Sequence, residues 1–128
     1  MTPDKKPKPE IAVLHCRFSL AGDAILTEPF DAGDFRVRPA LLPCTGKVEL
    51  PHLMQILEDG ADAVEVIGCP DMRCRNLDGS ARAAKRVERA RELLEEAGLG
   101  AERVGMSRGD GLARDEFLAL IKKRAKAL

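Results

Sequence analysis

Two hydrophobic periods follow one another along this chain, and the change of period predicts its secondary structure. Short apolar, β-branched runs predict strands, whereas apolar residues that recur every three to four positions predict helices. Strands that alternate with helices are typical of a parallel α/β sheet. We therefore expect a small, open, mostly parallel four-stranded sheet with helices on both faces. The expected strands are 11–16, 35–42, 62–68 and 101–107, and the expected helices are 50–59, 81–97 and 112–127, with a short helix also possible over 21–26.

Cap and turn residues mark the ends of the two clearest helices. Pro51 suits the first turn of the helix at 50–59, and Gly60 suits the position just past its end. Ser80 is placed to cap the helix at 81–97, and Gly98 ends it. The Arg- and Lys-rich face of this second helix offers a surface for a partner, although a solvated charged face is the simpler interpretation.

Two residues depart from the pattern of the strands that contain them. Pro39 has no backbone N–H, so we expect an edge position or a bulge in the strand at 35–42. Glu65 interrupts the apolar run at 62–68, which indicates a contact with a partner or an exposed edge.

Length and composition indicate one domain and exclude several classes of partner. The chain has 128 residues, which we divide into a disordered N-terminal tail, 1–9, and a single α/β domain, 10–128. Lys plus Arg and Asp plus Glu both total 21, and the aromatic residues are four Phe with no Trp or Tyr. Neither an electrostatic nor a stacking surface for nucleic acid is therefore expected. No apolar stretch reaches the length of a transmembrane helix, so we expect a cytoplasmic protein with no membrane contact.

The chemistry of the chain is concentrated in its four cysteines. Cys16, Cys44 and Cys69 each fall at the carboxyl end of a predicted strand, and Cys74 follows five residues after Cys69. The carboxyl ends of parallel strands meet at one edge of a sheet, which is where α/β proteins bind ligands. Clustered cysteines in the reducing cytoplasm favour metal binding or catalysis over disulfides. The pattern therefore predicts a site for a metal ion or an iron–sulfur cluster.

The residues leave several interpretations of the thiols open. Four thiolates complete an iron–sulfur cluster, and the C-x4-C spacing of Cys69 and Cys74 also occurs in plant-type two-iron ferredoxins. An all-cysteine zinc site normally has two short knuckles, and the second is missing here. The remaining interpretations are buried cysteines without a metal and an enzyme with Cys69 or Cys74 as its nucleophile. No C-x-x-C redox pair is present.

The two histidines and the segment Gly109-Asp-Gly111 are weaker candidates for functional residues. His15 precedes Cys16 and is a conceivable cluster ligand, but adjacent strand residues point to opposite faces, which favours a histidine without a metal role. His52 is expected to be exposed in the first turn of its helix. Gly109-Asp-Gly111 is only a fragment of a phosphate-binding pattern, which favours a plain turn.

Around the cysteines the chain resembles a known family. The matching segments are Cys44-Thr-Gly-Lys-Val48, Glu58-Asp-Gly-Ala-Asp-Ala-Val64, Gly68-Cys-Pro-Asp-Met-Arg-Cys74, Gly79-Ser80 and Arg86-Val87. They are similar to the hydrogenase iron–sulfur subunit family, typified by the delta subunit of methyl-viologen-reducing hydrogenase. The resemblance covers roughly residues 11–125 and is most specific over residues 44–87.

The resemblance implies a [2Fe–2S] cluster bound by Cys16, Cys44, Cys69 and Cys74. It also implies an electron-transfer subunit with no substrate site of its own. Such a subunit relays electrons between a hydrogenase- or formate-dehydrogenase-like partner and a flavin-containing, heterodisulfide-reductase-like subunit. The face that carries the cysteines is then the expected docking face, with apolar contacts from Phe18, Pro70 and Met72.

One segment departs from the family pattern. Where the family has a Cys-x-x-Cys region, this chain reads Cys16-Arg-Phe-Ser19. We assign the fourth ligand to Cys16, with Ser19 and His15 as the alternatives. The rival function is a non-catalytic assembly or interaction module that holds a structural zinc, or no metal, at the four cysteines.

Overall fold

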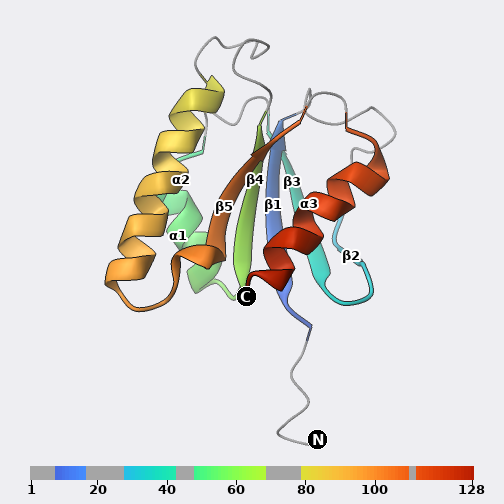
Figure 1. Cartoon of the computed structure of the whole chain (residues 1–128), viewed down its shortest axis with the longest axis horizontal. Helices are drawn as coiled ribbons and strands as arrows, with labels where there is room; N and C mark the ends of the chain where they lie inside the picture. Colours follow the sequence, from blue (N-terminus) through green and yellow to red (C-terminus); the bar gives the residue numbers. More distant parts are fainter. Residues whose placement is uncertain (1–7, 17–27, 43–47, 69–78, 110–111) are drawn as a thin grey trace, which may run out of the picture.

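The protein is described from a computed structural model, which covers residues 8–16, 28–42, 48–68, 79–109 and 112–128. These residues form one sheet with helices on both of its faces (Figure 1). The strands are β1 Glu10–Cys16, β2 Phe30–Asp31, β3 Arg36–Leu42, β4 Ala63–Gly68 and β5 Val104–Arg108. The helices are α1 Leu50–Glu58, α2 Gly79–Glu96 and α3 Arg114–Lys126, with a short 3₁₀ helix at Ala101–Arg103.

The sheet has the order β2-β3-β1-β4-β5, and its pairs are parallel except for the pair of β2 with β3. This confirms the open, mostly parallel sheet. The prediction of four strands was wrong by one, because β2 adds a fifth. Phe30 and Asp31 pair in register with Val37 and Arg36. Two residues inside a turn-rich stretch are too few to produce a periodic pattern, so β2 is defined only by its partner strand.

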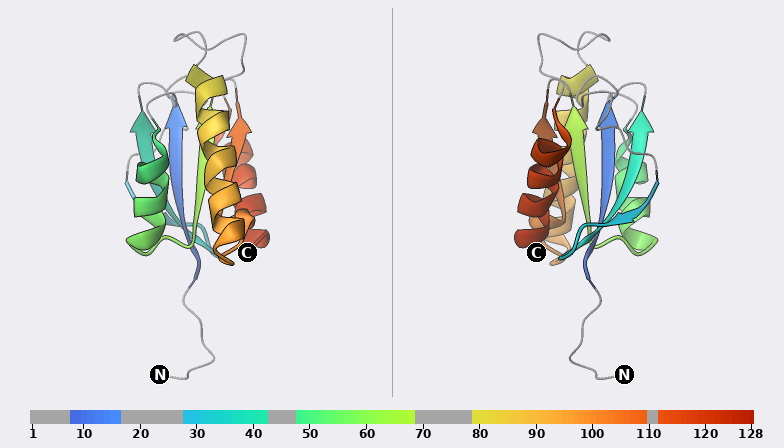
Figure 2. Two further views of the ribbon diagram at one scale, coloured as in Figure 1. Left: turned by 90° about the vertical axis from the view of Figure 1, so that its left-hand side faces the viewer. Right: turned by 90° about the vertical axis from the view of Figure 1, so that its right-hand side faces the viewer.

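Helices α1 and α2 cover one face of the sheet and α3 covers the other (Figure 2), which confirms the prediction of helices on both faces. A separate hydrophobic core lies on each face. Because side chains alternate along a strand, β1 and β4 supply both cores. The core beneath α1 and α2 includes Ala12, Leu14, Leu53, Val64, Val66, Val87 and Leu94. The core beneath α3 includes Ile11, Val13, Val37, Ile67, Phe117 and Ile121.

The ends of α1 and the carboxyl end of α2 follow the local signals in the sequence, whereas the predicted cap at Ser80 was wrong, because α2 already begins at Gly79. Pro51 lies in the first turn of α1, and Gly60 just beyond that helix has a φ of 120°. Gly98 beyond α2 has a φ of 77°. These left-handed conformations are ones that glycine adopts without steric cost. The last strand starts later than predicted, since residues 101–103 form the 3₁₀ helix and β5 begins at Val104.

Pro39 lies where β3 is the outer strand of the described sheet. The ladder with β2 includes Arg36 and Val37 and stops before Pro39, which pairs with Val13 of β1 on its other side. The missing N–H of Pro39 therefore costs no hydrogen bond to β2, and the predicted edge position is confirmed. At the start of this strand, the Arg36 amide donates to the Pro9 carbonyl at 2.8 Å.

Candidate metal centre

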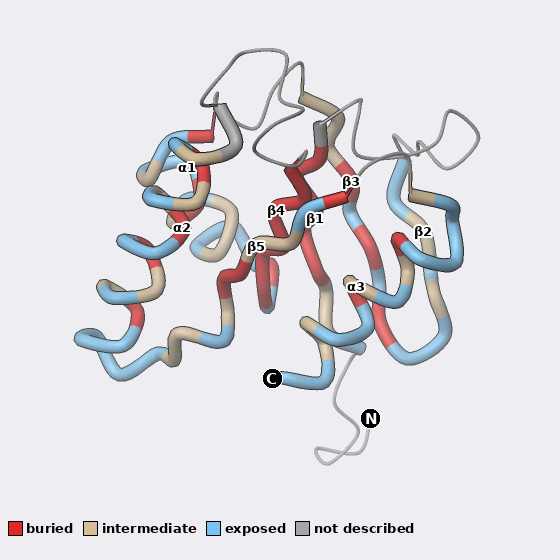
Figure 3. Tube along the Cα trace, turned by 45° about the horizontal axis from the view of Figure 1, so that its top comes forward, coloured by how far each residue is buried: buried red, intermediate tan, exposed pale blue. Residues whose placement is uncertain are grey.

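Three strand ends meet at one edge of the sheet, which we call the cysteine edge: the carboxyl ends of β1, β3 and β4. Cys16, the last residue of β1, pairs in register with Leu42, the last residue of β3. On the other side of β1, His15 pairs with Ile67, and Gly68 then ends β4. Figure 3 shows the molecule with this edge turned forward. The topology thus brings together strand ends that are far apart in the sequence.

The predicted ligands follow directly from these strand ends. Cys44 is the second residue after Leu42, and Cys69 is the residue after Gly68. Cys44, Cys69 and Cys74 lie outside the described residues, and Cys16 is described only as the backbone end of β1. The other residues expected here, Phe18, Ser19, Pro70 and Met72, and the short helix expected over 21–26, also lie outside them. The convergence of the thiols remains a prediction.

The spacing of the strand ends sets the scale of the predicted site. Neighbouring strands lie about 4.8 Å apart, so the ends of β3, β1 and β4 span roughly 10 Å. Thiolates are the donors that iron–sulfur clusters require, and four complete a cluster. Among the residues that the structure describes, no group of three or more His, Cys, Asp or Glu side chains is arranged to hold a metal ion.

His15 is part of the core beneath α3. Its side chain is fully buried, and its ring meets the ring of Phe117 edge to face, with centroids 5.8 Å apart and planes at 68°. This packing favours the interpretation of His15 as a histidine without a metal role. His52 is exposed, as predicted.

Glu65 is buried inside the sheet, so the prediction of an exposed edge or a contact with a partner was wrong. Its side chain is 1% exposed and lies in β4, between β1 and β5. Arg124 of α3 donates from Nε to Glu65 Oε1 at 2.7 Å, and the Ser107 hydroxyl donates to Glu65 Oε2. A buried carboxylate requires such partners, and here α3 and β5 supply them.

Arg86 links α2 to the connection that follows β3. Its Nη1 donates to the Val48 carbonyl at 2.7 Å, and Val48 is the first described residue after the stretch that contains Cys44. No local pattern indicates this role, because the acceptor is a main-chain carbonyl 38 positions away. The bond holds the amino-terminal half of α2 close to the cysteine edge.

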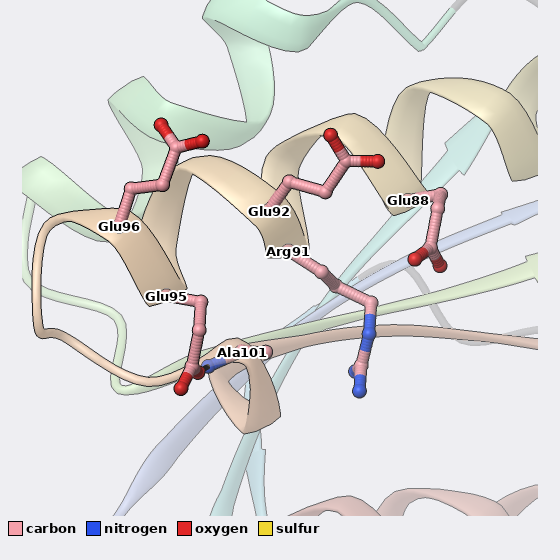
Figure 4. A pocket seen from close by; sticks show the side chains of 6 residues that line it. All are labelled: Glu88, Arg91, Glu92, Glu95, Glu96 and Ala101. Atoms are coloured by element: carbon pink, nitrogen blue, oxygen red, sulfur yellow. Dashed lines mark hydrogen bonds between the residues drawn. The ribbon is translucent and has the colours of Figure 1, made fainter.

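A shallow depression of about 410 Å³ lies towards the opposite end of α2 (Figure 4). Two of its side chains make local structural bonds: Arg91 donates to the Val104 carbonyl at 2.6 Å, and Glu95 accepts from the Ala101 amide at 3.2 Å. These bonds fix the 3₁₀ helix and the start of β5 to α2. The lining residues are Glu88, Arg91, Glu92, Glu95, Glu96 and Ala101.

A family comparison matches most of the chain. The family described as "Methyl-viologen-reducing hydrogenase, delta subunit" matches residues 21–128, which includes the stretches around Cys44, Cys69 and Cys74. This is the family that the motifs between Cys44 and Val87 resemble.

Three similar proteins are named as iron–sulfur subunits of F420-non-reducing hydrogenases. The vhu iron–sulfur subunit from Methanopyrus kandleri is 38% identical over 95 residues, 72% of each chain. The vhu iron–sulfur subunit from Methanocaldococcus jannaschii is 34% identical over 87 residues, 68% of this chain and 65% of that protein. The corresponding iron–sulfur subunit from Archaeoglobus profundus is 35% identical over 94 residues, 68% of this chain and 69% of that protein. The match thus spans about two thirds of the length of these relatives.

Among the helices that the structure describes, none is both long enough and apolar enough to cross a bilayer.

Proposed function

Because the chain belongs to the methyl-viologen-reducing hydrogenase delta subunit family, we propose that it is the electron-transfer subunit of a redox complex. It carries one [2Fe–2S] cluster, held by Cys16, Cys44, Cys69 and Cys74. The observation that carries the proposal is the cysteine edge, where three parallel strands end next to cysteines in a family whose relatives are named iron–sulfur subunits.

The cysteines and the sheet have separate roles in this proposal. Thiolates bind iron, and the strand ends hold the ligand-bearing connections next to one another. The Arg86 bond to the Val48 carbonyl fixes Val48, four residues after Cys44, to α2. When bound, a cluster of this type accepts and releases one electron at a time, so the chain needs no substrate pocket.

The partners in this proposal are protein subunits. One is a hydrogenase- or formate-dehydrogenase-like donor, and the other is a flavin-containing, heterodisulfide-reductase-like acceptor. We place the protein in the cytoplasm, where cysteines stay reduced. Phe18, Pro70 and Met72 are the proposed apolar contacts of the docking face.

Anaerobic reconstitution of the full chain with iron and sulfide tests the cluster. We expect equal amounts of iron and acid-labile sulfide, two of each per chain, visible charge-transfer absorption and a one-electron paramagnetic signal after reduction. The matched control is the same treatment of a Cys44→Ala/Cys69→Ala variant, which should bind neither.

The same measurement separates the proposal from its rival. About one zinc per chain without sulfide, in protein purified without oxygen, would favour an assembly module with a structural zinc site. A chain that binds neither iron nor zinc would leave the cysteines without a metal role and overturn the proposal.

A further inference from the structure

The charge on the exposed face of α2 changes from positive to negative along the helix. Arg82, Lys85 and Arg89 are exposed at spacings of three and four residues, so they form one row on the helix surface. Glu92 and Glu96 continue the same row and are also exposed. The exposed charges of α2 are therefore mainly basic from Arg82 to Arg89, where the exposed Glu88 lies beside the row, and acidic from Glu92 onwards.

This order of charges is the reverse of the one that stabilises a helix. The amino end of a helix carries partial positive charge and favours anions, and the carboxyl end favours cations. Helix α2 has no acidic residue in its first turn and no basic residue in its last turn. In α3 the order is the favourable one, with Asp115 and Glu116 in the first turn and Lys123, Arg124 and Lys126 in the last.

Spacing within the row adds to this unfavourable arrangement. Lys85 and Arg89 are four residues apart, as are Arg82 and Arg86, and like charges at that spacing repel each other on a helix. Arg89 also forms an exposed ion pair with Glu92 at 3.1 Å, a type of contact that contributes little to stability. The order of charges along α2 and the spacing of Lys85 and Arg89 therefore do not stabilise the helix, which points to a role outside it.

The basic half of α2 lies beside the cysteine edge. Helix α2 begins at Gly79, directly after the stretch that contains Cys69 and Cys74. The views in Figure 2 show its start at the end of the sheet where the parallel strands finish. The bond from Arg86 to the Val48 carbonyl joins the same half of the helix to the residue that follows the Cys44 stretch.

We propose that Arg82, Lys85 and Arg89 form a positively charged approach surface that selects electron-exchange partners with an acidic protein surface. This inference rests on the proposed function and names the chemistry of the partner. Long-range attraction raises the rate at which an oppositely charged partner arrives, and that effect weakens as salt is added. The acidic row of Glu92 and Glu96 repels the same partner and so directs it towards the cysteine edge.

A matched pair of protein probes tests the selection in the cluster-loaded chain. Native cytochrome c has a basic surface, and succinylated cytochrome c has the same haem with an acidic surface. In each reaction one electron leaves the reduced cluster and converts ferric haem to ferrous haem. We expect the Lys85→Glu/Arg89→Glu variant to react with the acidic probe roughly three- to ten-fold more slowly at low ionic strength, and with the basic probe faster.

The control variant is Lys122→Glu/Lys123→Glu, which makes the same change of net charge at exposed positions of α3. Its effect on the reaction rate with either probe should be well under two-fold, because the two lysines lie towards the carboxyl end of α3. That end of the helix lies away from the end of the sheet where the parallel strands finish (Figure 1). A Lys85→Gln/Arg89→Gln variant removes the charges without reversal and should show about half of the logarithmic change. Circular dichroism checks that every variant is folded.

A second measurement does not depend on the cluster. In the reduced, metal-free chain, the cysteine thiols react with a dianionic aromatic disulfide, dithiobis(nitrobenzoate), and with the neutral dithiodipyridine. The Lys85→Glu/Arg89→Glu variant should react with the dianionic reagent several-fold more slowly, relative to the neutral reagent, than the parent chain does. The Lys122→Glu/Lys123→Glu control should show no such difference. Equal effects of the α2 and α3 variants, or no effect of either, would overturn the inference. Failure of the chain to bind iron and sulfide would instead contradict the proposed function.

Discussion

Glu65 and Arg124 form an ion pair in the interior, at 2.7 Å between Glu65 Oε1 and Arg124 Nε. They are 59 positions apart in the sequence, and the pair joins β4 to the last turn of α3. Glu65 is 1% exposed and Arg124 18%. The guanidinium group also donates from Nη1 to the Glu102 carbonyl at 3.1 Å, so a single side chain fastens α3 to the edge of the sheet.

Gly105 makes room for this contact. It pairs in register with Glu65, and a Cβ atom at position 105 would overlap the guanidinium group of Arg124. The guanidinium group therefore crosses β5 where that strand has no side chain. Ser107, two residues further along the same face of β5, donates to the other carboxylate oxygen.

Replacement of Arg124 by alanine should leave a buried carboxylate without its cation. We expect the free energy of unfolding to fall by about 3 kcal/mol, measured by urea denaturation. Lys123→Ala, at the exposed neighbouring position, is the control and should change stability by less than about 0.5 kcal/mol. The double variant Glu65→Leu/Arg124→Leu removes both charges and should recover most of the loss. If Arg124→Ala lowers the free energy of unfolding by no more than Lys123→Ala does, the buried ion pair is contradicted.

Gly105→Ala should destabilise the protein through Arg124 rather than through the backbone. The added methyl group displaces the guanidinium group, and we expect a loss of about 1–2 kcal/mol in the parent chain. In the Arg124→Ala background the same substitution should cost less than about 0.5 kcal/mol, since the obstructed group is absent. Urea denaturation of the parent chain, the two single variants and the double variant gives the coupling energy between the two positions. Strict additivity of the two losses in the free energy of unfolding would show that Gly105 has another role.

The fourth cluster ligand can be identified by a series of single substitutions. We expect Cys16→Ala, Cys44→Ala, Cys69→Ala and Cys74→Ala each to lose most of the iron, the sulfide and the visible absorption after reconstitution. Ser19→Ala should bind as much iron as the parent chain. If Cys16→Ala retains the cluster and Ser19→Ala loses it, the assignment of Cys16 is wrong.

Removal of Lys8 should make the Asp31 carboxylate easier to protonate. Lys8 donates to the Asp31 carboxylate at 2.8 Å and the Gly33 amide donates at 2.8 Å, and these bonds hold the pKa of Asp31 below its ordinary value of 3.8. The stabilisation is present above pH 3.8 and is lost as the pH falls through the lowered pKa. Lys8→Ala should raise the pKa of Asp31 towards 3.8, whereas Lys122→Ala should not, as measured by NMR titration of the carboxyl carbon.

The regular part of the fold was predictable because its signals are local. The apolar runs of β1, β3 and β4, the stripe of α2 and the positions of Pro51, Gly60 and Gly98 act within one turn or one strand. The alternation of strands and helices then implies a parallel sheet, and parallel strands bring the last residues of β1, β3 and β4, which are Cys16, Leu42 and Gly68, to one edge.

The sequence by itself therefore determined the order of the main elements, the parallel sheet and the family, through short motifs and local periodicity. Only the tertiary structure decided which distant groups meet. In the folded protein β2 pairs with β3, and Arg86 donates to the Val48 carbonyl. Glu65, which the sequence suggested was exposed, is an interior partner of Arg124. The physical reason is that a charge or a two-residue strand has no local preference that identifies its partner. Such a group is stabilised by whichever segment the folded sheet places beside it.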